Sequence, residues 1–173
     1  MTVDRAHGAD VASVKAFPPQ QSERGVWHTI TRVEKYNDGI VDGHPDDVIE
    51  VEGNLLCDDG IAAMLNLLAK NTGTAYTNNT NAYVAMGTNA AAAGHSDTTL
   101  GTETDRKQAS AVVTDQSVVF SAAFDDDTSQ VAWAEVGVLN AAVAGDLLNH
   151  VVSALGTKAA GATWVLTITI TIS

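Results

Sequence analysis

The stretch Thr163–Ser173, TWVLTITITIS, decides the fold. Its large apolar residues stand at every second position: Trp164, Leu166, Ile168, Ile170 and Ile172. Three threonines alternate with them: Thr167, Thr169 and Thr171. Successive side chains of a β-strand point to opposite faces, so this strict alternation predicts a strand with one buried face. A final strand left at a sheet edge would be long and flat, which favours pairing with a second subunit.

Further strand patterns precede this segment along the chain. They are rich in β-branched and aromatic residues and cover 25–36, 48–56, 83–87, 116–124, 130–139 and 147–154. Segment 130–139 is apolar on both sides, which predicts a central strand covered on both faces. Residues 89–104 are small and polar and predict a long loop.

One helix is predicted near residues 59–70. Four apolar residues follow the spacing i, i+3, i+4 and i+7: Ile61, Met64, Leu65 and Leu68. Asp58 or Asp59 is expected to cap the first turn, and Lys70 to lie in the last turn, where the helix dipole favours a cation. We expect the helix to pack flat on a sheet through its apolar stripe.

These elements predict a mainly β fold, a β-sandwich or jelly-roll-like barrel of about six or seven strands with one packed α-helix. Residues 1–24 carry few large apolar groups, and Pro18-Pro19 favours extended backbone. We therefore expect an extended N-terminal arm over 1–24, either disordered or ordered by a neighbour, and a single domain over 25–173. The expected partner contacts are Phe17, Pro18, Pro19 and Trp27.

The charge balance narrows the function classes. The 173-residue chain has 9 Lys and Arg against 21 Asp and Glu, a formal net charge of −12. Its cations are scattered, so nucleic-acid binding is not expected. Cys57 is the only cysteine, which excludes an intramolecular disulfide. The apolar runs fall far short of the roughly 18 residues of a membrane span, and no phosphate-binding or CxxC motif predicts a cofactor.

Catalytic and metal-binding motifs are weak. His95-Ser96-Asp97 holds the residue types of a hydrolase triad, but consecutive side chains do not point at one another, and no G-x-S-x-G elbow exists. The acidic stretches 44–47 and 125–127 could hold a hard cation, yet neither has the spacing of a calcium loop. Solvated turns are the favoured interpretation of all three, so no catalytic or metal residue is predicted.

Two polar residues lie in apolar stretches of the sequence, where a buried side chain would need a hydrogen-bonding or charged partner. Glu135 lies in the apolar segment 130–139, where an unpaired carboxylate is costly, and an arginine is the expected partner, with Arg106 the candidate. Arg106 also stands three residues after Glu103, with which it can pair if that stretch is helical, or it can reach another subunit. His150 lies in an apolar stretch and is expected to be a hydrogen-bonded core or interface histidine.

Four segments carry a resemblance to a known class of proteins. They are YVAMGT at 83–88, DTTLGTETDR at 97–106, AEVGVLNA at 134–141 and GDLLNH at 145–150. Their order after the helix, and before the alternating final strand, resembles small structural proteins of tailed phages and related archaeal tailed viruses, over about residues 50–173. His150 stands where that family commonly has an arginine, so no role is carried over to that position.

The resemblance implies a non-enzymatic virion protein, assembled in the host cytoplasm. The first expectation is a capsid decoration or cement subunit that binds other virion proteins and forms a homo-oligomer, with a trimer favoured. The alternative is a tail, baseplate or fibre component with a carbohydrate- or receptor-binding role, which predicts exposed aromatic residues near one loop cluster. A hydrolase acting at 95–97 is a third alternative and would need Ser96 for activity.

Overall fold

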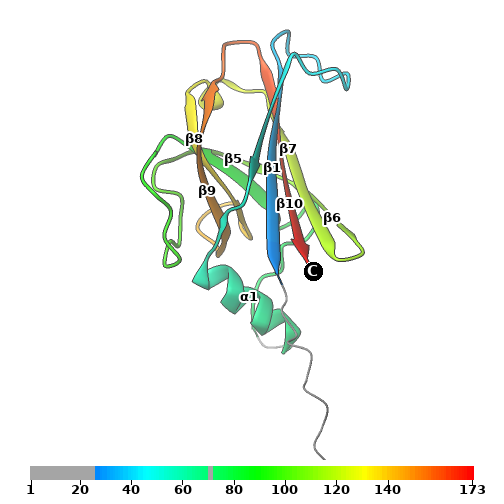
Figure 1. Ribbon diagram of the computed structural model, residues 1–173, viewed down its shortest axis with the longest axis vertical. Helices are drawn as coiled ribbons and strands as arrows, with labels where there is room; N and C mark the ends of the chain where they lie inside the picture. Colours follow the sequence, from blue (N-terminus) through cyan, green and yellow to red (C-terminus); the bar gives the residue numbers. More distant parts are fainter. Residues whose placement is uncertain (1–25, 70–71) are drawn as a thin grey trace, which may run out of the picture.

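A computed structural model describes residues 26–69 and 72–173. It is a mainly β sandwich of two five-stranded antiparallel sheets, as the sequence predicts (Figure 1). The expected arm over 1–24, with its partner-contact residues Phe17, Pro18 and Pro19, lies outside the described residues, and so does Lys70. No helix in the described ranges is long and apolar enough to cross a membrane.

The first sheet has the strand order β2-β1-β10-β7-β6. Its strands are β1 (Trp27–Tyr36), β2 (Asp47–Glu52), β6 (Ser110–Thr114), β7 (Ser117–Phe124) and β10 (Thr163–Ile172). The alternating strand β10 pairs with β1 on one side and β7 on the other. Strand β10 is therefore not at a sheet edge, and the pairing with a second subunit that an edge position would favour does not apply to it.

The two faces of β10 behave as the alternation predicts. Leu166 and Ile168 are fully buried, and Ile170 is nearly so. On the outer face, the hydroxyl of Thr167 lies 2.9 Å from that of Ser121, and the hydroxyl of Thr171 lies 2.7 Å from that of Ser117. Cross-strand hydroxyl pairs thus stabilise the outer face of the sheet between β10 and β7.

The second sheet has the strand order β3-β9-β8-β4-β5. Its strands are β3 (Leu55–Leu56), β4 (Tyr83–Gly87), β5 (Glu103–Gln108), β8 (Ala132–Leu139) and β9 (Leu147–Thr157). Strand β8 is central, as predicted for 130–139. Val136 and Val138 face the main core, while Leu139 packs under the β4–β5 loop with Leu100, so both faces are covered.

The main core lies between the two sheets and is rich in aromatic contacts. The Trp133 ring centroid is 4.9 Å from that of Phe124 and 5.0 Å from that of Trp164. Both tryptophans are almost fully buried. Trp27 is only partly buried at the start of β1, where its indole N–H donates to Asn54 Oδ1 at 3.1 Å.

The helix α1 (Asp58–Leu68) forms where expected but packs differently. Its N-cap is Cys57, without a side-chain cap, so the prediction that Asp58 or Asp59 caps it is wrong. A Cβ on Gly60 would lie 2.6 Å from the Leu148 backbone, which shows how closely the first turn abuts β9. This approach turns the small residues Gly60 and Ala63 inward and leaves most of the predicted apolar stripe outside.

The helix therefore lies across one end of the sandwich and not flat on a sheet (Figure 1). The exposed fractions in the stripe are 36% for Ile61, 59% for Leu65 and 82% for Leu68. Met64 alone among the stripe residues packs against the main core.

Two stretches differ from the predicted strand boundaries. Residues 48–56 divide into β2 and β3, in different sheets, at Gly53, whose φ of +80° suits only glycine well. Strands β5 and β6 were not predicted, because the charged sequence of β5 has no apolar alternation and the expected loop hid its start. A short 3-10 turn, η1 (Asp127–Ser129), precedes β8.

Candidate functional site

A buried polar cluster on the outer face of the second sheet contains Glu135 of β8. The carboxylate is completely buried. It accepts backbone N–H bonds from Asn89 at 3.2 Å, Gly101 at 2.7 Å and Thr102 at 2.7 Å. All three donors belong to the β4–β5 loop and its continuation to β5, drawn in green outside β8 and β9 (Figure 1). Charge-assisted bonds of this kind hold the carboxylate and the loop together.

His150 of β9 completes the cluster. Its Nε2 lies 2.9 Å from Glu135 Oε2, and its Nδ1 lies 2.8 Å from Asp97 Oδ2. Asp97 also accepts the Gly94 amide at 2.7 Å, and this bond, followed by the one to His150, lowers the pKa of Asp97 below its usual value. Each ring nitrogen of His150 is thus within hydrogen-bond distance of a carboxylate oxygen, so the ring bridges Asp97 and Glu135.

The cluster depends on a glycine in the neighbouring strand. A Cβ on Gly87 would lie 2.4 Å from Glu135 Oε1 and 2.4 Å from the Thr102 carbonyl oxygen. The site therefore accommodates the carboxylate only where β4 has no side chain. Residue 87 ends β4 opposite Glu135, and this pairing brings the loop donors over the carboxylate.

The polar groups of the cluster are bonded to one another and to the loop. Both nitrogens of His150 are bonded to carboxylates, so neither is free to contact a substrate. Ser96 is exposed, and no described hydrogen bond joins it to a histidine; His95 instead places Nδ1 3.2 Å from the Leu56 carbonyl oxygen. Asp97 pairs with His150, not with its sequence neighbours. The arrangement pins the loop to the sheet.

The expected arginine partner of Glu135 is wrong. Arg106 instead pairs with Glu103, at 2.8 Å from Nε and 2.6 Å from a terminal nitrogen, although this stretch is strand β5 and not a helix. It also donates to the carbonyl oxygens of Ala141 at 2.6 Å and Ala144 at 2.7 Å. Backbone amides and a histidine take the place that an arginine was expected to fill. The signal in the sequence was His150 itself, the only polar ring in an apolar strand.

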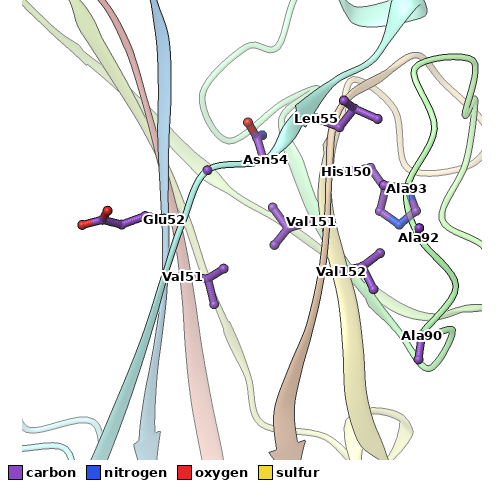
Figure 2. A pocket seen from close by; sticks show the side chains of 11 residues that line it. Val51, Glu52, Asn54, Leu55, Ala90, Ala92, Ala93, His150, Val151 and Val152 are labelled. Atoms are coloured by element: carbon purple, nitrogen blue, oxygen red, sulfur yellow. The ribbon is translucent and has the colours of Figure 1, made fainter.

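A cavity of about 470 Å³ lies between the end of β2 and β9, and His150 contributes to its wall. Figure 2 shows Val51, Asn54 and Val151 around its centre, His150 beside Ala92 and Ala93, and Glu52 directed away. The two nitrogens of His150 are bonded to Asp97 and Glu135. The ring therefore presents its face, and not a nitrogen, to this cavity.

The acidic turns are occupied by internal contacts. Partial burial raises the pKa of Asp126, but bonds from Lys107 and Thr128 outweigh this effect and hold the pKa well below its usual value. Asp46 accepts the Asn37 amide at 2.7 Å. Within the described ranges, no group of three His, Cys, Asp or Glu side chains could hold a metal ion. Burial raises the pKa of Cys57 to about 12, so its thiol stays protonated and unreactive at neutral pH.

An apolar surface at the helix end of the sandwich is the second candidate. We define the apolar end as Ile61, Leu65 and Leu68 of α1, Val113 of β6 and Ile172 of β10. Val113 is 74% exposed and Ile172 50% exposed. Met64 of the helix lines a cavity together with Val113 and Ile172, so α1, β6 and β10 meet at this end, while Ile61, Leu65 and Leu68 are exposed on the same helix. Exposed apolar groups gathered in this way mark protein interaction surfaces.

Comparisons with protein-family models, curated proteins and solved structures found no match.

Proposed function

We propose that this chain is a non-enzymatic structural protein that binds other protein subunits through its apolar end, as a capsid decoration or cement subunit of a tailed virus. The class of particle comes from the resemblance of the segments at 83–88, 97–106, 134–141 and 145–150. The observation that carries the binding role is the exposure of Ile61, Leu65 and Leu68 on a helix that would otherwise bury them.

The closed state of the polar cluster supports a role without catalysis. Each carboxylate of the Asp97–His150–Glu135 cluster is engaged by backbone amides and by the ring between them. A catalytic acid or base must reach a substrate proton, and these groups are already bonded to one another. Binding through an apolar surface requires no such group.

Charge supports a protein partner. The net charge of −12 repels nucleic acid and anionic membrane surfaces. The apolar end can instead bury its apolar side chains against a partner, and this burial drives association whatever the charge of the partner. We propose a homo-oligomer, with a trimer favoured, assembled in the host cytoplasm and retained in the virion.

The alternative of a carbohydrate-binding fibre component has less support. Trp133 and Trp164 are buried in the core, so neither offers a face to a sugar. Trp27 is partly buried and its N–H is bonded to Asn54.

Mass spectrometry of purified virus particles from the source culture tests the proposal. We expect this chain in an amount stoichiometric with the capsid protein, and its loss from particles when Leu65→Asp and Leu68→Asp are introduced together. The control variant His28→Ala changes an exposed residue on the outer face of β1, and it should stay on the particles. Absence of the unaltered chain from purified particles would contradict the proposal.

A further inference from the structure

The strand crossover at Gly53 leaves two sheet edges without a neighbouring strand. Strand β2 pairs with β1 only over Ile30–Lys35, so the first three residues of β1 have no strand beside them on this side. Strand β3 pairs with β9 only over Asn149–His150, and no strand in the described ranges continues along residues 151–157. The chain thus leaves the first sheet before its edge is complete, and it joins the second sheet for two residues only.

Two cavities lie on the two sides of this crossover. The cavity of about 470 Å³ shown in Figure 2 has Val51 of β2 and Val151 of β9 in its wall. A second cavity of about 530 Å³ lies against the uncovered start of β1, and Thr29 belongs to its wall. Glu52 and Gly53 line both cavities. We call the two cavities together the crossover groove.

Three buried polar atoms beside this groove have no hydrogen-bond partner in the described part of the chain. The first is the amide nitrogen of Asn54, whose amide oxygen accepts the Trp27 indole N–H at 3.1 Å; because an indole only donates, the nitrogen is left as the free donor. The others are the hydroxyls of Thr29 and Thr31, residues that are 2% and 0% exposed. Thr31 is paired with Val51 of the groove wall. Buried polar groups are nearly always bonded, so these atoms point to a bound group that offers donors and acceptors.

An extended peptide segment has the groups that this region lacks. The carbonyl oxygen of Leu148 accepts the Cys57 amide, so alternate residues of β9, Val152 included, direct their backbone groups to the uncovered side. The backbone of an added strand pairs with such an edge, and its alternate side chains can enter the apolar part of the groove. Charged residues commonly block exposed edges, and residues 151–157 contain none.

Charge indicates the kind of partner. Glu52 is exposed, its side chain points outward beside the groove (Figure 2), and no described cation pairs with it. Glu50 of the same strand is already paired with Arg32. A second copy of this chain would bring its own net charge of −12 to this site, whereas a basic side chain of a different protein would pair with Glu52.

We propose that the crossover groove binds an extended segment of a different protein, which adds a strand along β9 from Val152 and places a Lys or Arg side chain at Glu52. The amide nitrogen of Asn54 and the hydroxyl of Thr29 bond to the backbone of this segment. The crossover groove shares no residue with the apolar end, so the proposal does not rest on the virion role, and either proposal can fail alone.

Peptide titration of the full chain, followed by NMR, tests the proposal. The probe is a capped seven-residue peptide that alternates valine with threonine and has lysine at both ends (KVTVTVK), so that either strand direction brings a lysine near Glu52. We expect a Kd below about 1 mM, with shifts of the Asn54 side-chain amide signals and slower hydrogen exchange at the Val152 amide. The same peptide with glutamate at both ends should bind about 5-fold more weakly. A peptide with two central prolines (KVTPPVK), one of which must face β9, should not bind.

Three results would overturn the proposal. The first is the absence of binding by the lysine peptide at about 1 mM, which would leave the unpaired polar atoms to bound water. The second is equal binding of the proline peptide. The third is a Val152 amide that is already protected from exchange without peptide, because the edge would then be covered within the chain itself.

Variants of the chain locate the binding. Thr29→Val removes a hydroxyl that has no described partner, so it should leave Tm unchanged or raise it, yet weaken binding of the lysine peptide by about 5- to 10-fold. Thr169→Val, the same substitution on the outer face of β10, should leave binding unchanged. Glu52→Gln should weaken binding by about 5-fold, and Glu103→Gln on β5 should not. Binding that neither Thr29→Val nor Glu52→Gln alters would lie elsewhere on the chain and would contradict the proposal.

Discussion

The Asp97–His150–Glu135 cluster and the apolar end differ in where they place their side chains. The cluster holds polar groups inside the fold, whereas the apolar end exposes apolar groups on the surface. The cluster buries Glu135 and His150, and it bonds Glu135 to amides of the loop and to the ring of His150 on β9. The apolar end exposes leucine and isoleucine on a helix whose small residues face inward. A buried charge needs its partners within the chain, whereas exposed apolar groups gain stability only from a partner outside it. The difference assigns stability to the cluster and, under the proposed function, binding to the apolar end.

The strongest test of the cluster removes its central charge. Glu135→Gln should lower the free energy of unfolding by about 3–5 kcal/mol, because an amide group meets N–H donors that a carboxylate satisfied and His150 loses its partner. Denaturant unfolding measures the change. Glu103→Gln is the control, since it breaks a partly exposed ion pair that is worth about 0–1 kcal/mol. Equal effects of the two variants would contradict the structural role of the cluster.

Removing the ring should have a smaller effect. His150→Leu leaves Glu135 with its three amide donors but takes one partner from each carboxylate, at a cost of about 2–3 kcal/mol. Hydrogen exchange at the Gly101 and Thr102 amides should accelerate as the loop loosens. His28→Leu, at an exposed position on β1, should leave both measurements unchanged. Unaltered exchange in His150→Leu would show that the ring does not hold the loop.

Acid should weaken the cluster further. The pKa of Asp97 is lower in the folded protein than its ordinary value near 4, so its contribution is present above that value and is lost as pH falls through the folded pKa. Unfolding free energy measured across this acidic range should fall with pH, and Asp97→Asn should make the fall shallower. An unchanged slope in Asp97→Asn would indicate that its bonds to Gly94 and His150 add no stability.

Sequence patterns predicted the covered strands well and the polar contacts poorly. Alternation in 163–173 and the doubly apolar segment 130–139 identified β10 and β8, because burial imposes a period that local sequence displays. The partners of Glu135 were not visible, because backbone amides donate irrespective of residue type. Their position depends on the loop path over Gly87, which no spacing encodes.

The helix shows why an amphipathic pattern can mislead. The i, i+3, i+4 and i+7 spacing located α1 correctly but gave the wrong inward face. Close approach of Gly60 to the Leu148 backbone fixes the helix orientation, and this contact outweighs burial of Leu65 and Leu68. The apolar stripe is real, but it faces outward.

Substitutions in the exposed helix stripe should have the smallest effect on the stability of the fold and the largest effect on association. Replacing Leu65 and Leu68 together by Asp should change the free energy of unfolding by no more than about 0.5 kcal/mol per site, since both side chains are already exposed. Charges at these positions would have to be buried in any interface through the helix, which is costly. Unfolding midpoints of the variant and the unaltered chain provide the check.

Sedimentation velocity over a range of concentrations tests the central claim most directly. The unaltered chain should sediment as an oligomer, the Leu65→Asp/Leu68→Asp variant as a folded monomer, and Glu103→Gln as the unaltered chain does. A strictly monomeric unaltered chain, or an oligomer that the two aspartates leave intact, would contradict association through the apolar end.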